Sequence, residues 1–262
     1  MKLFTPGPVQ VKQSIVDASA KAPCFHRAKG FEELYASCKD LLNKVYQSDE
    51  TKTCLILNGS GTYANETVVH SLTTKNDKIL LLSNGDFGDR FEKMLTLHQR
   101  NFKIHKKEHG DVFILDEIED EVKNYKPNKV IIVALETSTG IINPIPFLGD
   151  LSKTYNFRLF VDAVSALGAE DISVTRDNIA VCTSVPNKAI ESLPGISFVC
   201  VDKALLEETR NVESSSLYLD LHKYYDSSLK NQTPSTPGVN IYYALEEALK
   251  ELIAEGLEER RE

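Results

Sequence analysis

Tryptophan is absent from the 262-residue sequence, methionine occurs only twice, and no apolar run approaches the length of a membrane-spanning helix. The five cysteines are an odd number without the spacing of a disulfide framework or a metal site, so we predict free thiols and no metal ligands. No secretory leader precedes Thr5. These absences favour a cytoplasmic protein that does not insert into membranes.

The sequence also lacks a basic segment. Lysine and arginine total 30 against 38 aspartates and glutamates, and the net charge of −8 is spread along the chain. Without a basic patch there is no electrostatic attraction for nucleic acid or an anionic membrane, and we exclude both as partners. Hydrophobic residues make up 42% and charged residues 26%, as is usual for a globular protein of one α/β domain or slightly more.

Short apolar runs alternate with amphipathic segments, which predicts a parallel α/β sheet covered by helices. Strands are predicted over 53–57, 78–82, 101–105, 129–135, 157–161, 179–182 and 196–201. Helices are predicted over 30–46, 91–99, 116–125 and 144–155, from residue 63 onwards, and from 239 toward 261. The β-branched run over 129–135 is typical of a strand that is buried on both faces.

One lysine lies on a short polar loop between two of these apolar strands. Lys188 follows the strand over 179–182, and Pro194 and Gly195 close the loop before the next strand. An ammonium group in such a place loses hydration, which lowers its pKa and favours the neutral amine that attacks a carbonyl. A lone lysine is more often an exposed loop residue, so this interpretation depends on its surroundings.

A glycine-rich turn follows the strand over 53–57. The turn reads Asn58-Gly59-Ser60-Gly61-Thr62, and helical sequence begins directly after it. Free backbone N–H groups, the positive end of the helix dipole and two hydroxyl groups together predict a site for a single phosphate. A capped helix start after a tight turn is the simpler alternative.

Polar or aromatic residues follow three more of the predicted strands. Phe87 lies in a predicted loop between two glycines, where its ring can either face a planar ligand or fill the core. Thr137 and Thr139 follow the strand over 129–135, and Asp162 ends the strand over 157–161. Ligands of parallel α/β sheets bind at this edge, and a carboxylate there needs a cation unless it caps a helix.

Taken together, these features match the requirements of pyridoxal phosphate (PLP). This cofactor needs an anion pocket, a stacking ring, a partner for its O3′ atom, a carboxylate beside its pyridine nitrogen and an amine for its aldehyde. The candidates, in the same order, are the turn with Ser60, Gly61 and Thr62, then Phe87, the hydroxyls of Thr137 and Thr139, Asp162 and Lys188. We therefore expect one PLP site at the carboxyl edge of the sheet.

The sequence resembles the class V, serine–pyruvate-like aminotransferases of PLP fold type I. The resemblance runs in order from about residue 3 to residue 245. Its segments are Thr5-Pro6-Gly7-Pro8, Gly59-Ser60-Gly61-Thr62, 84–90, 136–140, Val161-Asp162-Ala163-Val164-Ser165, 184–195 and 233–237. It implies a mostly parallel, seven-stranded sheet sandwiched between helices in a large domain.

The resemblance also assigns roles to single residues. Lys188 would form the Schiff base and then move the proton of the substrate, and Asp162 would pair with the pyridine nitrogen. Phe87 and Val164 would contact the two faces of the ring, and Thr137 would contact O3′. The remaining residues implied are Ser60, Gly61 and Thr62 for the phosphate, Gln232 and Thr233 for the phosphate of a partner subunit, and Gly7 for the substrate. A homodimer with shared active sites follows from these roles.

Three regions are expected on the same ground. They are an N-terminal arm over 1–15, a large PLP-binding domain over 16–237, and the start of an interdomain helix over 238–262. Relatives continue for roughly a hundred residues as a C-terminal lobe that carries an arginine for the substrate carboxylate. We expect that lobe to be largely absent from this chain, and the lost carboxylate clamp to weaken catalysis.

The implied reaction is transfer of an amino group from a small donor to pyruvate or glyoxylate. The segments over 84–90 and 184–195 resemble 2-aminoethylphosphonate–pyruvate transaminases, whereas Phe25-His26-Arg27 resembles the alanine/serine–glyoxylate branch. Alanine, serine and 2-aminoethylphosphonate therefore all stay open as donors. The alternative is a truncated, non-catalytic protein that binds PLP or acts as a scaffold.

Overall fold

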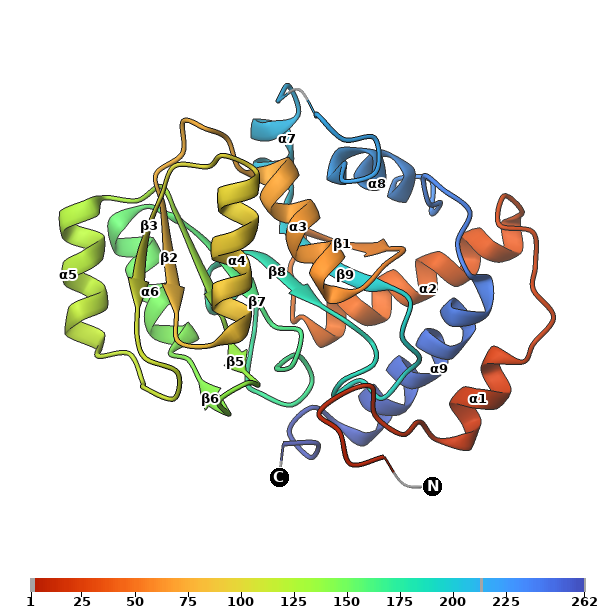
Figure 1. Cartoon of the computed structure of the whole chain (residues 1–262). Coiled ribbons are helices and arrows are strands. Elements are labelled where there is room, and N and C mark those ends of the chain that lie inside the picture. The colour runs from red at the N-terminus through yellow and green to blue at the C-terminus, as the bar shows by residue number, and fades with distance from the viewer. Residues whose placement is uncertain (1–2, 213, 262) are drawn as a thin grey trace.

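The protein is built around one twisted sheet of seven strands (Figure 1). A computed structural model describes residues 3–212 and 214–261. The strand order is β1-β9-β8-β7-β4-β2-β3, and all neighbours run parallel except β9, which is antiparallel to β1 and β8. The strands are β1 (Lys52–Leu57), β2 (Ile79–Ser83), β3 (Phe102–Lys106), β4 (Lys129–Val133), β7 (Arg158–Asp162), β8 (Ile179–Ser184) and β9 (Ser197–Asp202).

Helices cover both faces of the sheet, because alternate strand residues point to opposite sides. In β1, Cys54 and Ile56 face one helix layer, and Leu55 and Leu57 face the other. The first layer contains α1 (Gln13–Ser19), α2 (Lys29–Val45), α5 (Leu115–Tyr125), α6 (Ile145–Tyr155) and α9 (Val239–Glu255). The second contains α3 (Gly61–Leu72), α4 (Asp86–Leu97), α7 (Lys203–Thr209) and α8 (Leu221–Ser228). This three-layer arrangement confirms the predicted α/β fold.

Helix α4 begins at Asp86, five residues before the predicted start. The buried carboxylate of Glu136 accepts hydrogen bonds from the backbone N–H groups of Phe87 and Gly88, both at 3.1 Å. These bonds satisfy donors that the first turn of a helix cannot pair internally. Phe87 therefore lies on the first turn of α4, and its prediction as a loop residue was wrong.

The predicted strand over 129–135 is interrupted after Val133. The side chain of Asn143 donates a hydrogen bond of 2.8 Å to the carbonyl oxygen of Val133, which ends the main ladder there. The chain then forms a small hairpin of β5 (Leu135–Glu136) and β6 (Ile141–Ile142). This hairpin holds Glu136 at the carboxyl edge of the sheet, in reach of α4.

The last helix packs into the first helix layer. Helix α9 lies against α1 and α2, and Figure 1 shows the three together at the right of the molecule. The ring of Tyr242 packs edge-on against Phe31 of α2 at 5.2 Å between centroids and is fully buried. The helix ends at Glu255, before the predicted end near residue 261, because Gly256 adopts a φ of 99°.

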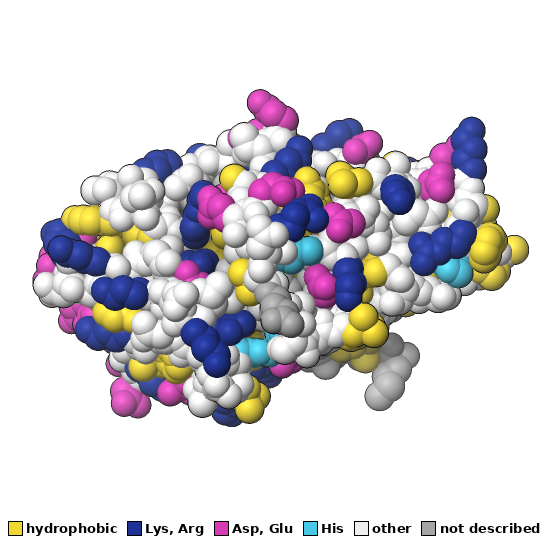
Figure 2. Space-filling model, turned by 90° about the horizontal axis from the view of Figure 1, so that it is seen from above, with side chains coloured by type: hydrophobic (Ala, Val, Ile, Leu, Met, Phe, Trp, Pro, Cys, Tyr) yellow, Lys and Arg dark blue, Asp and Glu magenta, His cyan; other side chains and the backbone are white. Residues whose placement is uncertain are grey.

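Surface charges are intermingled by sign. Figure 2 shows basic and acidic side chains interspersed on the face seen from above. Arg210, for example, pairs with Asp226 at 3.0 Å and with Glu207 at 3.0 Å. Among residues 3–212 and 214–261, no helix combines the length and apolarity needed to cross a membrane.

The packing of α9 generates a stability prediction. Leu249 lies on the inward face of α9 and is fully buried. Leu249→Ala is therefore expected to lower the free energy of unfolding by about 2–5 kcal/mol. Its neighbour Lys250 is exposed, and Lys250→Ala should change that free energy by at most about 0.5 kcal/mol. Urea unfolding followed by circular dichroism measures both. Equal, small effects of the two substitutions would contradict the integration of α9 into the core.

Candidate active site

A cavity of about 280 Å³ lies at the carboxyl ends of β1, β7 and β8. Loops that follow these strands converge there because the strands are parallel to one another. Seven of the residues that the sequence singled out line it: Ser60, Gly61, Thr62, Phe87, Asp162, Val164 and Lys188. The tertiary structure thus brings together segments that are more than a hundred residues apart in the chain.

Lys188 lies on the turn after β8, and its side chain is half-buried. Burial lowers the pKa of its ammonium group below the ordinary value, and the charge of Asp162 opposes this shift. The N-terminal segment passes directly over the lysine. A Cβ atom at Gly7 would lie 2.6 Å from Cε and 2.8 Å from Nζ of Lys188, so a side chain at this point would displace the end of the lysine.

Asp162 is the most deeply buried charged group of the cavity, with 4% of its surface exposed. Its Oδ2 accepts a hydrogen bond of 2.6 Å from Asn65 Nδ2, and its Oδ1 accepts one of 2.8 Å from the backbone N–H of Val164. Thr183 donates to the amide oxygen of Asn65 at 2.5 Å and so orients it. Burial raises the pKa of Asp162 to about 6, against the effect of these hydrogen bonds.

The glycine turn (residues 58–62) starts helix α3. Ser60 is the N-cap residue and accepts a hydrogen bond of 3.3 Å from the backbone N–H of Tyr63, which confirms the capped helix start. Gly61 lies against the Asp162 loop, since a Cβ atom there would be 2.9 Å from Cγ2 of Val164. The capped turn also faces the cavity, so the capping role and an anion-binding role are compatible.

Phe87 is held at the cavity by its position on α4. Arg90, one turn later, places its guanidinium carbon 4.8 Å from the centroid of the Phe87 ring. The Nη1 atom of Arg90 donates a hydrogen bond of 3.0 Å to Thr62 Oγ1. The guanidinium of Arg90 therefore contacts both the Phe87 ring and the glycine turn.

Four predicted residues do not line this cavity: Gly7, whose backbone passes over Lys188, and Thr137, Gln232 and Thr233. Thr137 lies nearby, where its Oγ1 is 3.4 Å from Oγ of Ser165. Gln232 and Thr233 are held elsewhere by Arg27, which donates a hydrogen bond of 2.8 Å to each of them. In the single chain, only 9% of Gln232 and 1% of Thr233 is exposed.

Asn65 and Arg90 line the cavity although the sequence analysis did not single them out as site residues. Asn65 follows Thr62 by three residues on α3, and Arg90 follows Phe87 by three on α4. Residues three apart share one side of a helix, so this spacing was an available signal. For Arg90 this spacing could not be used, because the helix was predicted to begin at residue 91, after both Phe87 and Arg90. Glu136, which caps α4, gave no such signal, because its partner is 49 residues away in the chain.

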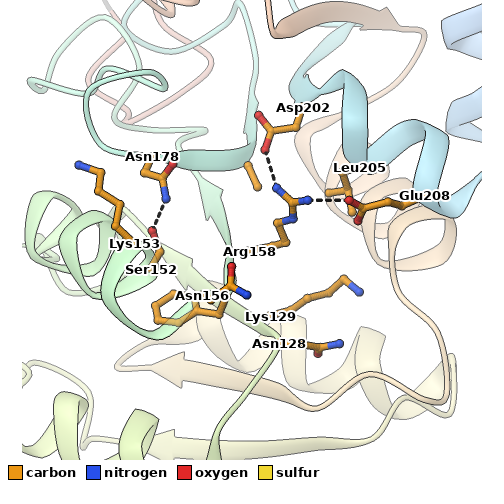
Figure 3. Close-up of a pocket in the computed structure, with 12 residues that line it drawn as sticks. Asn128, Lys129, Ser152, Lys153, Asn156, Arg158, Asn178, Asp202, Leu205 and Glu208 are labelled. Carbon is orange, nitrogen blue, oxygen red and sulfur yellow. Dashed lines mark hydrogen bonds and ion pairs between the residues drawn. The ribbon is translucent and has the colours of Figure 1, made fainter.

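A larger cavity of about 420 Å³ lies at the opposite edge of the sheet (Figure 3). Its basic residues are Lys129, Lys153 and Arg158, and each pairs with a carboxylate. In Figure 3, Arg158 points toward Glu208, at 2.7 Å, and toward Asp202. Because its cations are neutralised, this cavity does not meet the requirement for a free amine, and the smaller cavity is the candidate active site.

Comparisons with known proteins agree with this geometry. The family model described as Aminotransferase class-V matches residues 10–262. An uncharacterised aminotransferase of Methanocaldococcus jannaschii is 34% identical over 263 residues, which cover 98% of this chain and 67% of that protein. A 2-aminoethylphosphonate–pyruvate transaminase of Phocaeicola vulgatus is 30% identical over 266 residues, with coverages of 99% and 72%.

Solved structures of aminotransferases are also similar to this chain. The alanine–glyoxylate aminotransferase of a Nostoc species superposes with a TM-score of 0.89 at 28% identity. The superposition covers 98% of this chain and 68% of that one. This chain therefore spans about two thirds of the length of these relatives, and it belongs to the class V aminotransferase family.

Proposed function

We propose that this protein is a PLP-dependent transaminase that moves an amino group from a small amino donor to pyruvate or glyoxylate. One observation carries the proposal: the amine of Lys188 and the buried carboxylate of Asp162 share one cavity with the glycine turn. When bound, PLP supplies an aldehyde that condenses with amines and a ring that accepts electrons from the substrate carbon. The protein supplies binding, orientation and proton transfer.

The surroundings of the buried Asp162 carboxylate indicate whether these residues fit PLP. Each oxygen of Asp162 accepts one hydrogen bond, yet no cation of the described residues lies within ion-pair distance of it. A buried carboxylate without a cation is costly, and the protonated pyridine nitrogen of PLP would provide that cation. The residues present therefore fit PLP.

The chain's own groups then have distinct tasks. Lys188 would bind the aldehyde carbon and move a proton at the α-carbon of the substrate through Nζ. Asn65 and Thr183 would hold Asp162 in place. Phe87 and Val164 would hold the two faces of the ring. The other assigned contacts are Ser60, Gly61 and Thr62 to phosphate, Thr137 to O3′, and the backbone of Gly7 to the substrate over Lys188.

The donor is proposed from the relatives. A 2-aminoethylphosphonate–pyruvate transaminase and an alanine–glyoxylate aminotransferase are both similar to this chain, so we propose 2-aminoethylphosphonate, alanine or serine as donor. The alternative of a non-catalytic, truncated PLP-binding protein gains no support from the described residues. We place the protein in the cytoplasm, where its five free cysteines would stay reduced.

A homodimer with shared active sites is part of the proposal. Leu217 and Tyr218 are 84% and 54% exposed, and the hydroxyl of Tyr218 donates to the carbonyl oxygen of Asn58 in the glycine turn at 3.3 Å. This exposed apolar surface lies beside the glycine turn, where we propose that the segment around Gln232 and Thr233 of a partner arrives.

Sedimentation equilibrium tests the dimer. The wild-type protein should have twice the mass of one chain, and Leu217→Asp should shift it toward the monomer because a charge would be buried in the interface. Val112→Asp is the matched control, because Val112 is also exposed, at 65%, and does not line the cavity. A wild-type monomer, or equal dissociation by both variants, would argue against this interface.

The central experiment locates the amine that binds the cofactor. The protein is mixed with PLP, its visible absorbance is recorded, and borohydride reduction followed by peptide mass spectrometry identifies the modified lysine. We expect label on Lys188, loss of the absorbance band in Lys188→Ala, and an unchanged band in Lys203→Ala, which removes an exposed lysine.

Donor addition separates a transaminase from a protein that only binds PLP. With 2-aminoethylphosphonate, alanine or serine, the absorbance band should disappear and a carbonyl product should form. Label spread over surface lysines would refute the site. Label confined to Lys188 without turnover of any of these donors would favour the non-catalytic alternative.

The charge of Asp162 leads to a pH prediction for the cofactor-free protein. Its pKa is about 6 in the folded state and 3.8 as a free side chain, so the native state binds more protons between these values. Stability therefore falls as pH rises through this window, by at most about 3 kcal/mol. Asp162→Asn removes this dependence.

Urea unfolding at pH 4, 5, 6 and 8 measures the effect. The free energy of unfolding of Asp162→Asn minus that of wild type should rise between pH 4 and 6 and then stay level. Asp111→Asn, at an exposed carboxylate, should give a flat difference over the same range. A flat difference for Asp162→Asn as well would show that burial does not dominate the pKa of this group.

A further inference from the structure

Arg90 is the one cationic residue other than Lys188 that lines the candidate active site, as far as residues 3–212 and 214–261 are concerned. It projects from the first turns of α4 toward the glycine turn, and its side chain is exposed to solvent in the single chain. Its Nη1 atom lies 3.0 Å from Thr62 Oγ1, and its guanidinium carbon lies 4.8 Å from the centroid of the Phe87 ring. Two neighbours thus hold the guanidinium beside the glycine turn.

The charge of Arg90 is not neutralised by the protein. Within the described part of the chain, no carboxylate lies within 4.0 Å of it. Arg27 and Arg100 also lack an ion pair there, but each donates two hydrogen bonds to neutral oxygens. The other five arginines form ion pairs: Arg158, Arg176, Arg210, Arg260 and Arg261. The nearest acids in sequence are engaged elsewhere. Asp89 and Glu92 pair with Lys106 at 2.8 and 3.4 Å, and Asp86 faces His109 at 3.7 Å. An arginine in a cavity without an acidic partner is suited to an anionic ligand.

The hydrogen-bond donors of Arg90 also favour an anionic ligand. A guanidinium carries five N–H donors in a planar fork, and the structure uses one of them, at Thr62. The remaining donors match the oxygens of a tetrahedral oxyanion. Thr62 also belongs to the glycine turn, whose backbone N–H groups begin α3, so an anion held there would lie close to Arg90.

We propose that Arg90 is an oxyanion-binding residue, which holds a phosphoryl or phosphonate group together with the glycine turn. This inference rests on the proposed function and names one more binding residue of the same site. The anion can come from either of two sources, the phosphate of PLP or the phosphonate of a 2-aminoethylphosphonate donor. Stacking on Phe87 fixes the guanidinium so that little conformational entropy is lost on binding.

Paired ligands with and without the anion test this role. The dissociation constant of the full-length protein is measured by fluorescence titration for PLP and for pyridoxal, which lacks the phosphate. If Arg90 binds the cofactor phosphate, Arg90→Gln should weaken PLP binding by about 10- to 100-fold and pyridoxal binding by less than about twofold. Arg90→Lys, which keeps the charge but loses the fork, should fall between wild type and Arg90→Gln.

The second ligand pair identifies a substrate anion. If Arg90 binds a phosphonate, Arg90→Gln should leave PLP binding unchanged, raise the KM for 2-aminoethylphosphonate about tenfold or more, and leave the KM for alanine unchanged. Lys93→Gln is the matched control, since Lys93 is an exposed cation on the same helix. It should change none of these values.

Two results would overturn the inference. Equal weakening of PLP and pyridoxal would mean that Arg90 only supports the Phe87 ring. Unchanged constants for all four ligands would mean that Arg90 contacts no anion. Failure of the wild-type protein to form a PLP adduct at Lys188 would instead refute the proposed function itself. Thermal unfolding of each variant ensures that only folded proteins are compared.

Discussion

The site depends on one carboxylate, Asp162, that is buried at the carboxyl end of β7 without a cationic partner among the described residues. Burying such a group is unfavourable unless hydrogen bonds hold it, and two elements supply them. Asn65 reaches it from α3 and is itself oriented by Thr183 of β8, and Val164 provides a backbone N–H. These bonds join α3, β7 and β8 at one point, and the glycine turn follows because it is the start of α3.

A second buried carboxylate organises the other side of the cavity. Glu136 is fully buried on the β5–β6 hairpin and accepts hydrogen bonds from the first turn of α4. This contact sets where α4 starts, and therefore where Phe87 and Arg90 lie. The two carboxylates do different work: Glu136 is satisfied by the chain's own N–H groups, whereas Asp162 still lacks the positive charge that a ligand can bring.

Membership of the class V aminotransferases agrees with these different roles of Glu136 and Asp162. The matched relatives are about half as long again as this chain. The described residues contain an amine, a buried carboxylate and a glycine turn in one cavity. The chemistry proposed for the chain follows from these groups, and the similarity narrows the choice of donors.

The sequence by itself determined the alternation of strands and helices, the glycine turn, and the positions of Lys188 and Asp162 at strand ends. These features are local, because strand period, turn residues and apolar runs depend on neighbours in the chain. The tertiary structure alone decided the start of α4, the partners of α9 and the inclusion of Asn65 and Arg90 in the cavity. Each of these depends on a contact between residues far apart in the chain, such as Glu136 with Phe87 or Tyr242 with Phe31, and no local pattern encodes which distant groups will meet.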